Sequence, residues 1–172
     1  MINQGFATTL LCVVPPYAVT VPPAGPAALL GYLKAFGIHD VDFLDLRLYV
    51  PDSYATTYSA TSVWGDALAI DVPDLPIVLR LLDAFDRGSD FLDQDDPLLS
   101  AYCLERAINP SYLRTYLAYL DRFFETTFAQ IPHLELVGFS TWNSNYLTTL
   151  MAARHLKRRA RPPIVVTGGP QV

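Results

Sequence analysis

The chain has 172 residues, of which 51% are hydrophobic and 17% are charged, and its formal net charge is −5. This composition is typical of one globular domain with a substantial core, and it excludes a disordered segment or a small disulfide scaffold. The acidic balance argues against a nucleic-acid-binding face, because the few basic residues gather mostly at 157–161. We expect those cations in the last turn of a helix, where they offset the helix dipole.

The cysteines and the N-terminus indicate a cytoplasmic protein. Cys12 lies in an apolar run and Cys103 in a helical pattern, and neither belongs to a CxxC pair or shows metal-ligand spacing. The first residues lack a basic segment followed by a long apolar run. No apolar stretch approaches the roughly 20 residues of a membrane span. We therefore expect no membrane contact.

The N-terminal third predicts a strand–helix–strand unit. Residues 8–14 form an apolar, β-branched run that is typical of a strand buried on both faces, and Pro15-Pro16 ends it. The alternating residues 41–47 predict a half-exposed edge strand. The connection between two such parallel strands is right-handed in about 98% of cases.

A helix is predicted between these strands, over residues 27–36. Pro26 suits its first turn and Gly37 its end. Gly31, in the middle, suggests that the helix packs closely on the sheet. The expected core stripe consists of Leu29, Leu30, Leu33 and Phe36.

Helical patterns return at 75–87, 97–108 and 110–130, where we expect a helical insertion of about 75–130 that covers one end of the sheet. Residues 51–74 show no lasting period. The acidic residues between 90 and 96 lack the glycine and the distal glutamate of an EF-hand, so a solvated linker is favoured over a calcium site.

The C-terminal part predicts two further strands, 134–140 and 163–167, with a helix over 146–160 between them. The fold class is therefore α/β, a doubly wound, Rossmann- or flavodoxin-like, mostly parallel sheet of order 2-1-3-4. Such a sheet normally continues with another helix and strand. We thus expect the 172 residues to be the first part of a longer polypeptide.

Three connections are expected at the carboxyl edge of this sheet, where doubly wound folds bind ligands. These are the proline-rich loop 15–25, the turn 140–145 at a helix start, and the turn 168–170. A stiff, apolar loop suits a large flat ligand, and the free N–H groups of the helix start suit a polar one. The chain lacks the glycine motifs that cradle dinucleotides or nucleoside triphosphates, and it lacks a Gly-x-Ser-x-Gly elbow. A binding site is therefore predicted, with no catalytic residue.

Four motifs in order carry a family resemblance. They are Pro15-Pro16-Tyr17 with Pro22–Lys34, then Val41–Leu46, then Val137–Trp142, and finally Ile164–Pro170. Together they resemble the N-terminal cobalamin-binding domain of B12-dependent radical S-adenosylmethionine enzymes. The resemblance covers about 8–47 and 134–170 and leaves out the helical insertion.

The resemblance implies that residues 1–172 form one cobalamin-binding-like domain. The corrin would lie on the carboxyl edge, and its nucleotide tail would run down between strands, lined by the serine turn and the paired glycines, which let the backbone approach a ligand closely. The implied cofactor-binding residues are Pro16, Tyr17, Val19, Val21, Pro22, Ser140, Thr141, Trp142, Asn143, Gly168, Gly169 and Pro170. Taken alone, Gly168-Gly169 is as readily an ordinary turn.

No metal-ligating residue is predicted. The Asp-x-His-x-x-Gly motif that supplies a lower cobalt ligand in related domains is absent. His39 and His133 precede strands and belong at the amino edge, while His155 lies within a helix. We expect Tyr17, Val19 and Val21 to pack beneath the corrin instead, where an apolar shell would tune the metal.

The implied parent enzyme is a methyltransferase acting on a peptide or other natural-product precursor. Its S-adenosylmethionine and [4Fe-4S] cluster would be bound by a downstream radical domain, whose three-cysteine motif this chain lacks, so the chain is not expected to be catalytic alone. One alternative is a non-enzymatic α/β module that binds a nucleotide, or docks a protein partner through the aromatic residues of 112–128. Another is a member of the family that has lost cobalamin.

Overall fold

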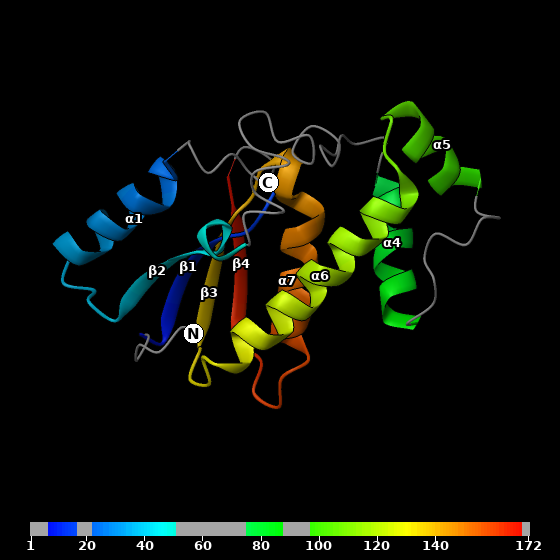
Figure 1. Ribbon diagram of the computed structural model, residues 1–172. Helices are drawn as coiled ribbons and strands as arrows, with labels where there is room; N and C mark the ends of the chain where they lie inside the picture. The colour runs from blue at the N-terminus through cyan, green and yellow to red at the C-terminus, as the bar shows by residue number, and fades with distance from the viewer. Residues whose placement is uncertain (1–6, 17–21, 51–74, 88–96, 170–172) are drawn as a thin grey trace.

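Four parallel strands form the centre of the molecule (Figure 1). The computed structural model describes residues 7–16, 22–50, 75–87 and 97–169. The sheet has the order β2-β1-β3-β4, as the sequence predicts, and all three strand pairs are parallel. The strands are β1 (Thr9–Val13), β2 (Val41–Asp45), β3 (Leu136–Ser140) and β4 (Ile164–Gly168).

The helices lie in layers on either side of this sheet (Figure 1). One helix, α1, lies on one side, α6 and α7 lie on the other, and α4 and α5 lie farther out beyond them. Their bounds are α1 (Ala24–Ala35), α4 (Leu75–Arg87), α5 (Pro97–Glu105), α6 (Pro110–Ala129) and α7 (Tyr146–Lys157). Two short 3-10 turns, η1 (Leu46–Tyr49) and η3 (Asn143–Asn145), follow β2 and β3.

The main core lies between the sheet and the pair α6 and α7. Alternate strand residues point into it, among them Leu10, Cys12, Val137 and Phe139, because successive side chains of a strand face opposite sides. The helices supply Leu113, Tyr116, Leu117, Leu120, Phe124 and Phe128 from α6, and Leu147, Met151 and Leu156 from α7. Thus α6 belongs to the layer that covers the sheet, whereas α4 and α5 lie at the periphery.

Three aromatic residues of α6 belong to the core, and Tyr119 and Phe123 are partly buried against it. The side chains of Tyr116, Phe124 and Phe128 are at most 3% exposed. A docking surface built on these aromatics would need them on the outside. Their burial removes the main support for a partner-binding module that uses this helix.

The predicted core stripe of α1 is wrong. No residue of α1 is buried, Leu29 is 46% exposed and Phe36 is 68% exposed. Gly31 does not mark close packing either, because no atom outside its neighbouring residues and the backbone of its own helix lies within 4 Å of a Cβ built there. The helix is apolar on nearly every side, so its sequence does not specify which side faces the sheet.

Candidate functional site

Asn145 fixes the start of the first loop to the turn after β3. Its side chain is fully buried, and its Nδ2 donates to the carbonyl oxygens of Val14 and Ser140, each at 3.2 Å. Its Oδ1 accepts a hydrogen bond of 2.7 Å from the N–H of Trp142. The hydroxyl of Thr148, one helical turn further on, donates to the carbonyl of Pro15. Loops 131 or more residues apart in sequence are thus held together at the carboxyl edge.

The glycine turn after β4 lies directly against the serine turn after β3. The N–H of Thr141 donates to the carbonyl of Gly168 at 2.7 Å. Gly169 has a φ of +131°, and a Cβ at this position would lie 2.3 Å from the carbonyl oxygen of Thr141. Only glycine fits this close approach of two backbones. The described parts of the three predicted connections therefore converge.

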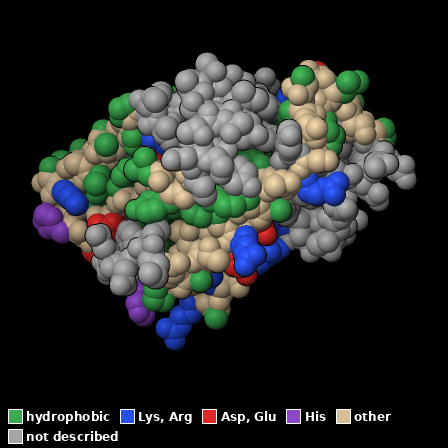
Figure 2. Space-filling model, viewed as in Figure 1, with side chains coloured by type: hydrophobic (Ala, Val, Ile, Leu, Met, Phe, Trp, Pro, Cys, Tyr) green, Lys and Arg blue, Asp and Glu red, His purple; other side chains and the backbone are tan. Residues whose placement is uncertain are grey.

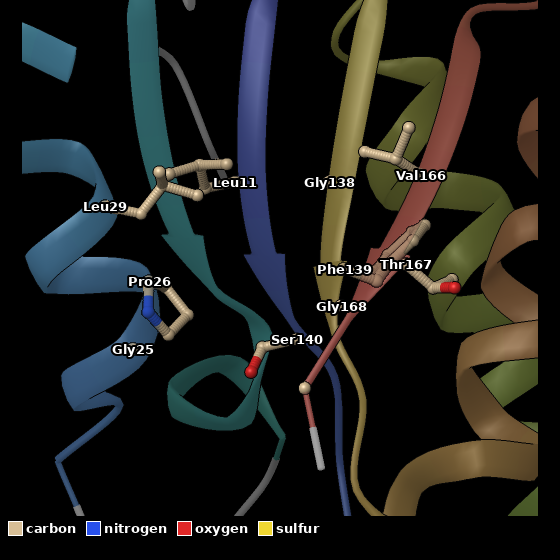
Figure 3. Close-up of a pocket in the computed structure, with 11 residues that line it drawn as sticks. Leu11, Gly25, Pro26, Leu29, Gly138, Phe139, Ser140, Val166, Thr167 and Gly168 are labelled. Carbon is tan, nitrogen blue, oxygen red and sulfur yellow. The ribbon is translucent and has the colours of Figure 1, made fainter. Parts of the chain in front are cut away.

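A groove of about 300 Å³ opens beside this edge, between α1 and the face of the sheet that α1 covers only in part (Figure 3). Leu11, Gly138 and Val166, from three neighbouring strands, line its floor, and Leu29 of α1 faces them. Ser140 lies at the end of the groove that is nearest the carboxyl edge of the sheet. In the space-filling view, hydrophobic side chains gather between α1 and the strands (Figure 2).

Gly138 keeps this groove open. A Cβ at this position would lie 3.1 Å from Cδ2 of Leu11 and 3.6 Å from Cγ2 of Val166. Any larger side chain at this position would therefore enter the groove. A glycine inside a strand often marks such a close approach.

Few polar groups border the groove, and one of them is unsatisfied. Thr141 is only 2% exposed, and its buried Oγ1 has no hydrogen-bond partner. Buried hydroxyls normally have partners, so this one is an exception among the described residues next to the groove. Ser140, which is half-buried, offers a second hydroxyl.

Cys12 does not contribute to this chemistry. Burial, with a further effect of the Asp45 carboxylate, raises the pKa of its thiol far above the ordinary value, so the thiol stays protonated. Its side chain belongs to the core between the sheet and the helices α6 and α7. It is therefore not available at the groove.

Some of the predicted cofactor-binding residues line the groove, and others lie at its border or outside the described residues. Ser140, Gly168 and Gly169 line the groove, and Thr141 lies buried beside it. The remaining described ones border the same edge: Pro16 is buried, Pro22 is exposed just before α1, Trp142 is 38% exposed and Asn143 is half-buried. Tyr17, Val19, Val21 and Pro170 lie outside the described residues.

Eight of the residues that line the groove were missed by the sequence analysis, among them Leu11, Leu29, Gly138 and Val166. Gly138 carried a signal, because glycine inside an apolar strand points to a close approach. The others did not, since Leu11 and Val166 resemble any buried strand residue and Leu29 resembles a core residue.

The histidines lie where the sequence predicts. His39 and His133 are exposed and precede β2 and β3, so they belong to the amino edge of the sheet. His155 lies within α7, and its Nε2 is 2.7 Å from Oδ1 of Asp121 on α6. Within the described ranges, no group of three or more histidine, cysteine or acidic residues could hold a metal ion.

A second cleft, of about 370 Å³, lies between α6 and α7 and is lined by residues of both charges. Besides the contact between His155 and Asp121, a guanidinium N–H group of Arg159 donates to the carbonyl oxygens of Ile131 and Pro132. These contacts tie the connection before β3 to the end of α7. They give the cleft a structural role.

Comparison of the chain with models of protein families, with curated proteins and with solved structures finds no match. Among the helices in the described part of the chain, none combines the length and the apolar character needed to cross a membrane.

Proposed function

We propose that this domain binds cobalamin and is the cofactor-binding part of a B12-dependent radical S-adenosylmethionine enzyme, a methyltransferase acting on a peptide or other natural-product precursor. The observation that carries the proposal is the glycine-floored groove that opens at the meeting point of the serine and glycine turns. The class of enzyme is inferred from the resemblance of the four sequence motifs and their order.

The groove has the size and lining for one part of such a cofactor. A cavity of about 300 Å³ is at the lower end of small-molecule sites, so it suits a flat ring group and not a whole corrin. Leu11, Val166 and Leu29 would contact the faces and edges of that ring. The larger body of the cofactor would lie across the carboxyl edge, within reach of the Ser140 hydroxyl.

The donor set of the described edge fits a cobalamin held without a protein imidazole. His39 and His133 belong to the opposite edge, and His155 faces α6. Bound cobalamin would supply the methyl-carrying chemistry. The residues of this chain would bind and orient it and exclude water from one side, while S-adenosylmethionine and the iron–sulfur cluster would be held by a downstream radical domain.

A nucleotide is the second candidate ligand. The groove accepts a flat heteroaromatic ring of either kind, and its position next to the switch between β1 and β3 suits both. Cobalamin is preferred because the start of α1 lacks a glycine cradle for phosphates.

Filling the groove tests the proposal. The protein is mixed with hydroxocobalamin, excess ligand is removed by gel filtration, and the visible spectrum is recorded. We expect the unmodified protein to retain colour. Val166→Trp should weaken retention at least about tenfold, because the indole occupies the groove, which corresponds to about 1.4 kcal/mol.

Ile164→Trp is the matched control. Ile164 lies two residues earlier on the same face of β4, is 64% exposed and does not line the groove, so this variant should keep its colour. A folded but colourless unmodified protein would refute cobalamin binding. If Val166→Trp retained hydroxocobalamin as the unmodified protein does, the groove would be excluded as the binding site. Retention of a radiolabelled adenine nucleotide in place of hydroxocobalamin would favour the second candidate.

A further inference from the structure

Helix α1 is held against the described structure by apolar contacts. Its backbone hydrogen bonds stay within residues 22–38, and no hydrogen bond or ion pair joins residues 24–35 to another element among the described residues. Leu30 and Leu33 are half-buried, and Leu29 is 46% exposed. Apolar contacts have no preferred direction, so a helix attached by them alone shifts more easily than one that hydrogen bonds fix in place.

The two ends of α1 differ in how they are anchored. Past the C-terminal end, Gly37 leads toward Asp40, whose carboxylate accepts a hydrogen bond of 3.0 Å from the N–H of Thr8, just before β1. This end is therefore fixed at the amino edge of the sheet. The N-terminal end lies at the carboxyl edge, where Gly25 and Pro26 line the groove. Within the described residues, no hydrogen bond ties this end to the strands.

Gly37 is a suitable hinge between the anchored end and the helix. It has a φ of +80°, and no atom outside its neighbouring residues lies within 4 Å of a Cβ built there. Hinges are a few residues at the ends of elements that absorb a change in φ and ψ. The 12 residues of α1 span about 18 Å, so a rotation of about 10° at Gly37 moves the N-terminal end by about 3 Å.

Such a rotation narrows the groove. The groove separates Leu29 from the strand residues opposite it, Leu11, Gly138 and Val166 (Figure 3). Apolar side chains of both walls are therefore exposed, Leu29 to 46% and Val166 to 47%. A flat apolar group between the walls would bury both, and burial of apolar surface is favourable.

We propose that α1 is a lid over the groove and that it closes when a ligand fills the groove. The helix pivots about Gly37, and Gly25, Pro26 and Leu29 at its other end contact the outer face of the ligand. The inference rests on the proposed function, because it takes the groove as the ligand site. It adds that ligand binding and the attachment of α1 are one coupled equilibrium. A ligand that binds only beneath the closed lid must reduce the opening of α1 by the same factor that the open lid weakens binding.

Filling the groove from within tests the lid without any ligand. In Val166→Trp the indole occupies the groove and gives α1 an apolar surface to pack on. Amide hydrogen exchange of α1 should therefore slow at least about tenfold relative to the unmodified protein, which corresponds to about 1.4 kcal/mol. Ile164→Trp is the matched control, because Ile164 lies outside the groove on the same face of β4, and α1 should exchange there as in the unmodified protein. Unchanged or faster exchange of α1 in folded Val166→Trp would overturn the lid.

Hydroxocobalamin gives a second reading, on the unmodified protein. At a free concentration of about 100 times the Kd, exchange of α1 should slow about 100-fold, because opening of the lid requires release of the ligand. The amides of α4, which lies away from the groove (Figure 1), should exchange at the same rate with and without hydroxocobalamin. Retained colour with unchanged exchange of α1 would overturn the lid and leave cobalamin binding intact. A colourless protein would refute cobalamin binding, and the ligand-free comparison would then decide the lid by itself.

Discussion

At the scale of single residues, Asn145 organises the candidate site. One buried amide serves three backbone groups, the carbonyls of Val14 and Ser140 and the N–H of Trp142. No hydrophobic side chain could replace it, because buried backbone groups without partners are costly. The site's shape therefore depends on a residue that does not line the groove.

Asn145→Ala should lower the free energy of unfolding by about 2–6 kcal/mol, since the buried carbonyl of Val14 loses its partner at about 1–3 kcal/mol and two part-buried hydrogen bonds are lost at about 0.5–1.5 kcal/mol each. Urea denaturation followed by circular dichroism measures the change. Asn143→Ala is the control, because that side chain is half-buried two residues away and should change stability by about 0.5 kcal/mol or less. Equal stability of the two variants would show that the amide does not hold the loops together.

At the scale of elements, the starts of β1 and β2 are tied by carboxylates. Asp40 accepts hydrogen bonds from the N–H and the hydroxyl of Thr8, and Asp42 accepts one from the N–H of Ala7. The side-chain bond from Thr8, followed by its backbone bond, lowers the pKa of Asp40 below the ordinary value of 3.8. This end of the strand pair is thus fixed at the edge opposite the candidate site.

The contribution of Asp40 to the stability of the fold depends on pH, because its pKa is lower in the folded protein. A lowered folded-state pKa means that the contribution to stability is complete above pH 3.8 and is lost as the pH falls through the lower, folded-state value. Thr8→Ala should raise the pKa of Asp40 toward 3.8, as measured by NMR titration of its carboxyl carbon. Thr9→Ala should leave the titration unchanged, and an unchanged midpoint in Thr8→Ala would refute the role of the hydroxyl.

At the scale of the whole molecule, the two sides of the sheet are covered very differently. Helix α7 buries six residues, namely Leu147, Thr148, Thr149, Met151, Ala152 and Leu156, whereas α1 buries none. Burial of apolar area is the main source of stability for a helix in a folded protein. We therefore expect α1 to open more readily than α7, and the groove beneath it to change width as it does.

Amide hydrogen exchange measures that difference. The amides of α1 should exchange at least about tenfold faster than those of α7, a difference of about 1.4 kcal/mol in the free energy of opening. The amides of α6, whose apolar side is buried, serve as a second slow reference. Equal protection in α1 and α7 would mean that exposure of the α1 side chains does not weaken its attachment.

The sequence alone specified the types of the elements and their order in the sheet. Hydrophobic periodicity is a local property, and the right-handed crossover rule turns a strand–helix–strand order into a strand arrangement. The parallel direction of the strands places their carboxyl ends at one edge, and with them the serine turn and the paired glycines. The resemblance to a cobalamin-binding domain was also visible there, and it stays a prediction.

Only the tertiary structure decided which side of α1 faces the sheet, that Asn145 joins two loops, and that Leu11, Gly138 and Val166 form a groove. Each of these depends on residues that are far apart in the chain but adjacent in space. A helix that is apolar on nearly every side carries no local preference for one side, and an asparagine before a helix predicts a cap and not a link between loops.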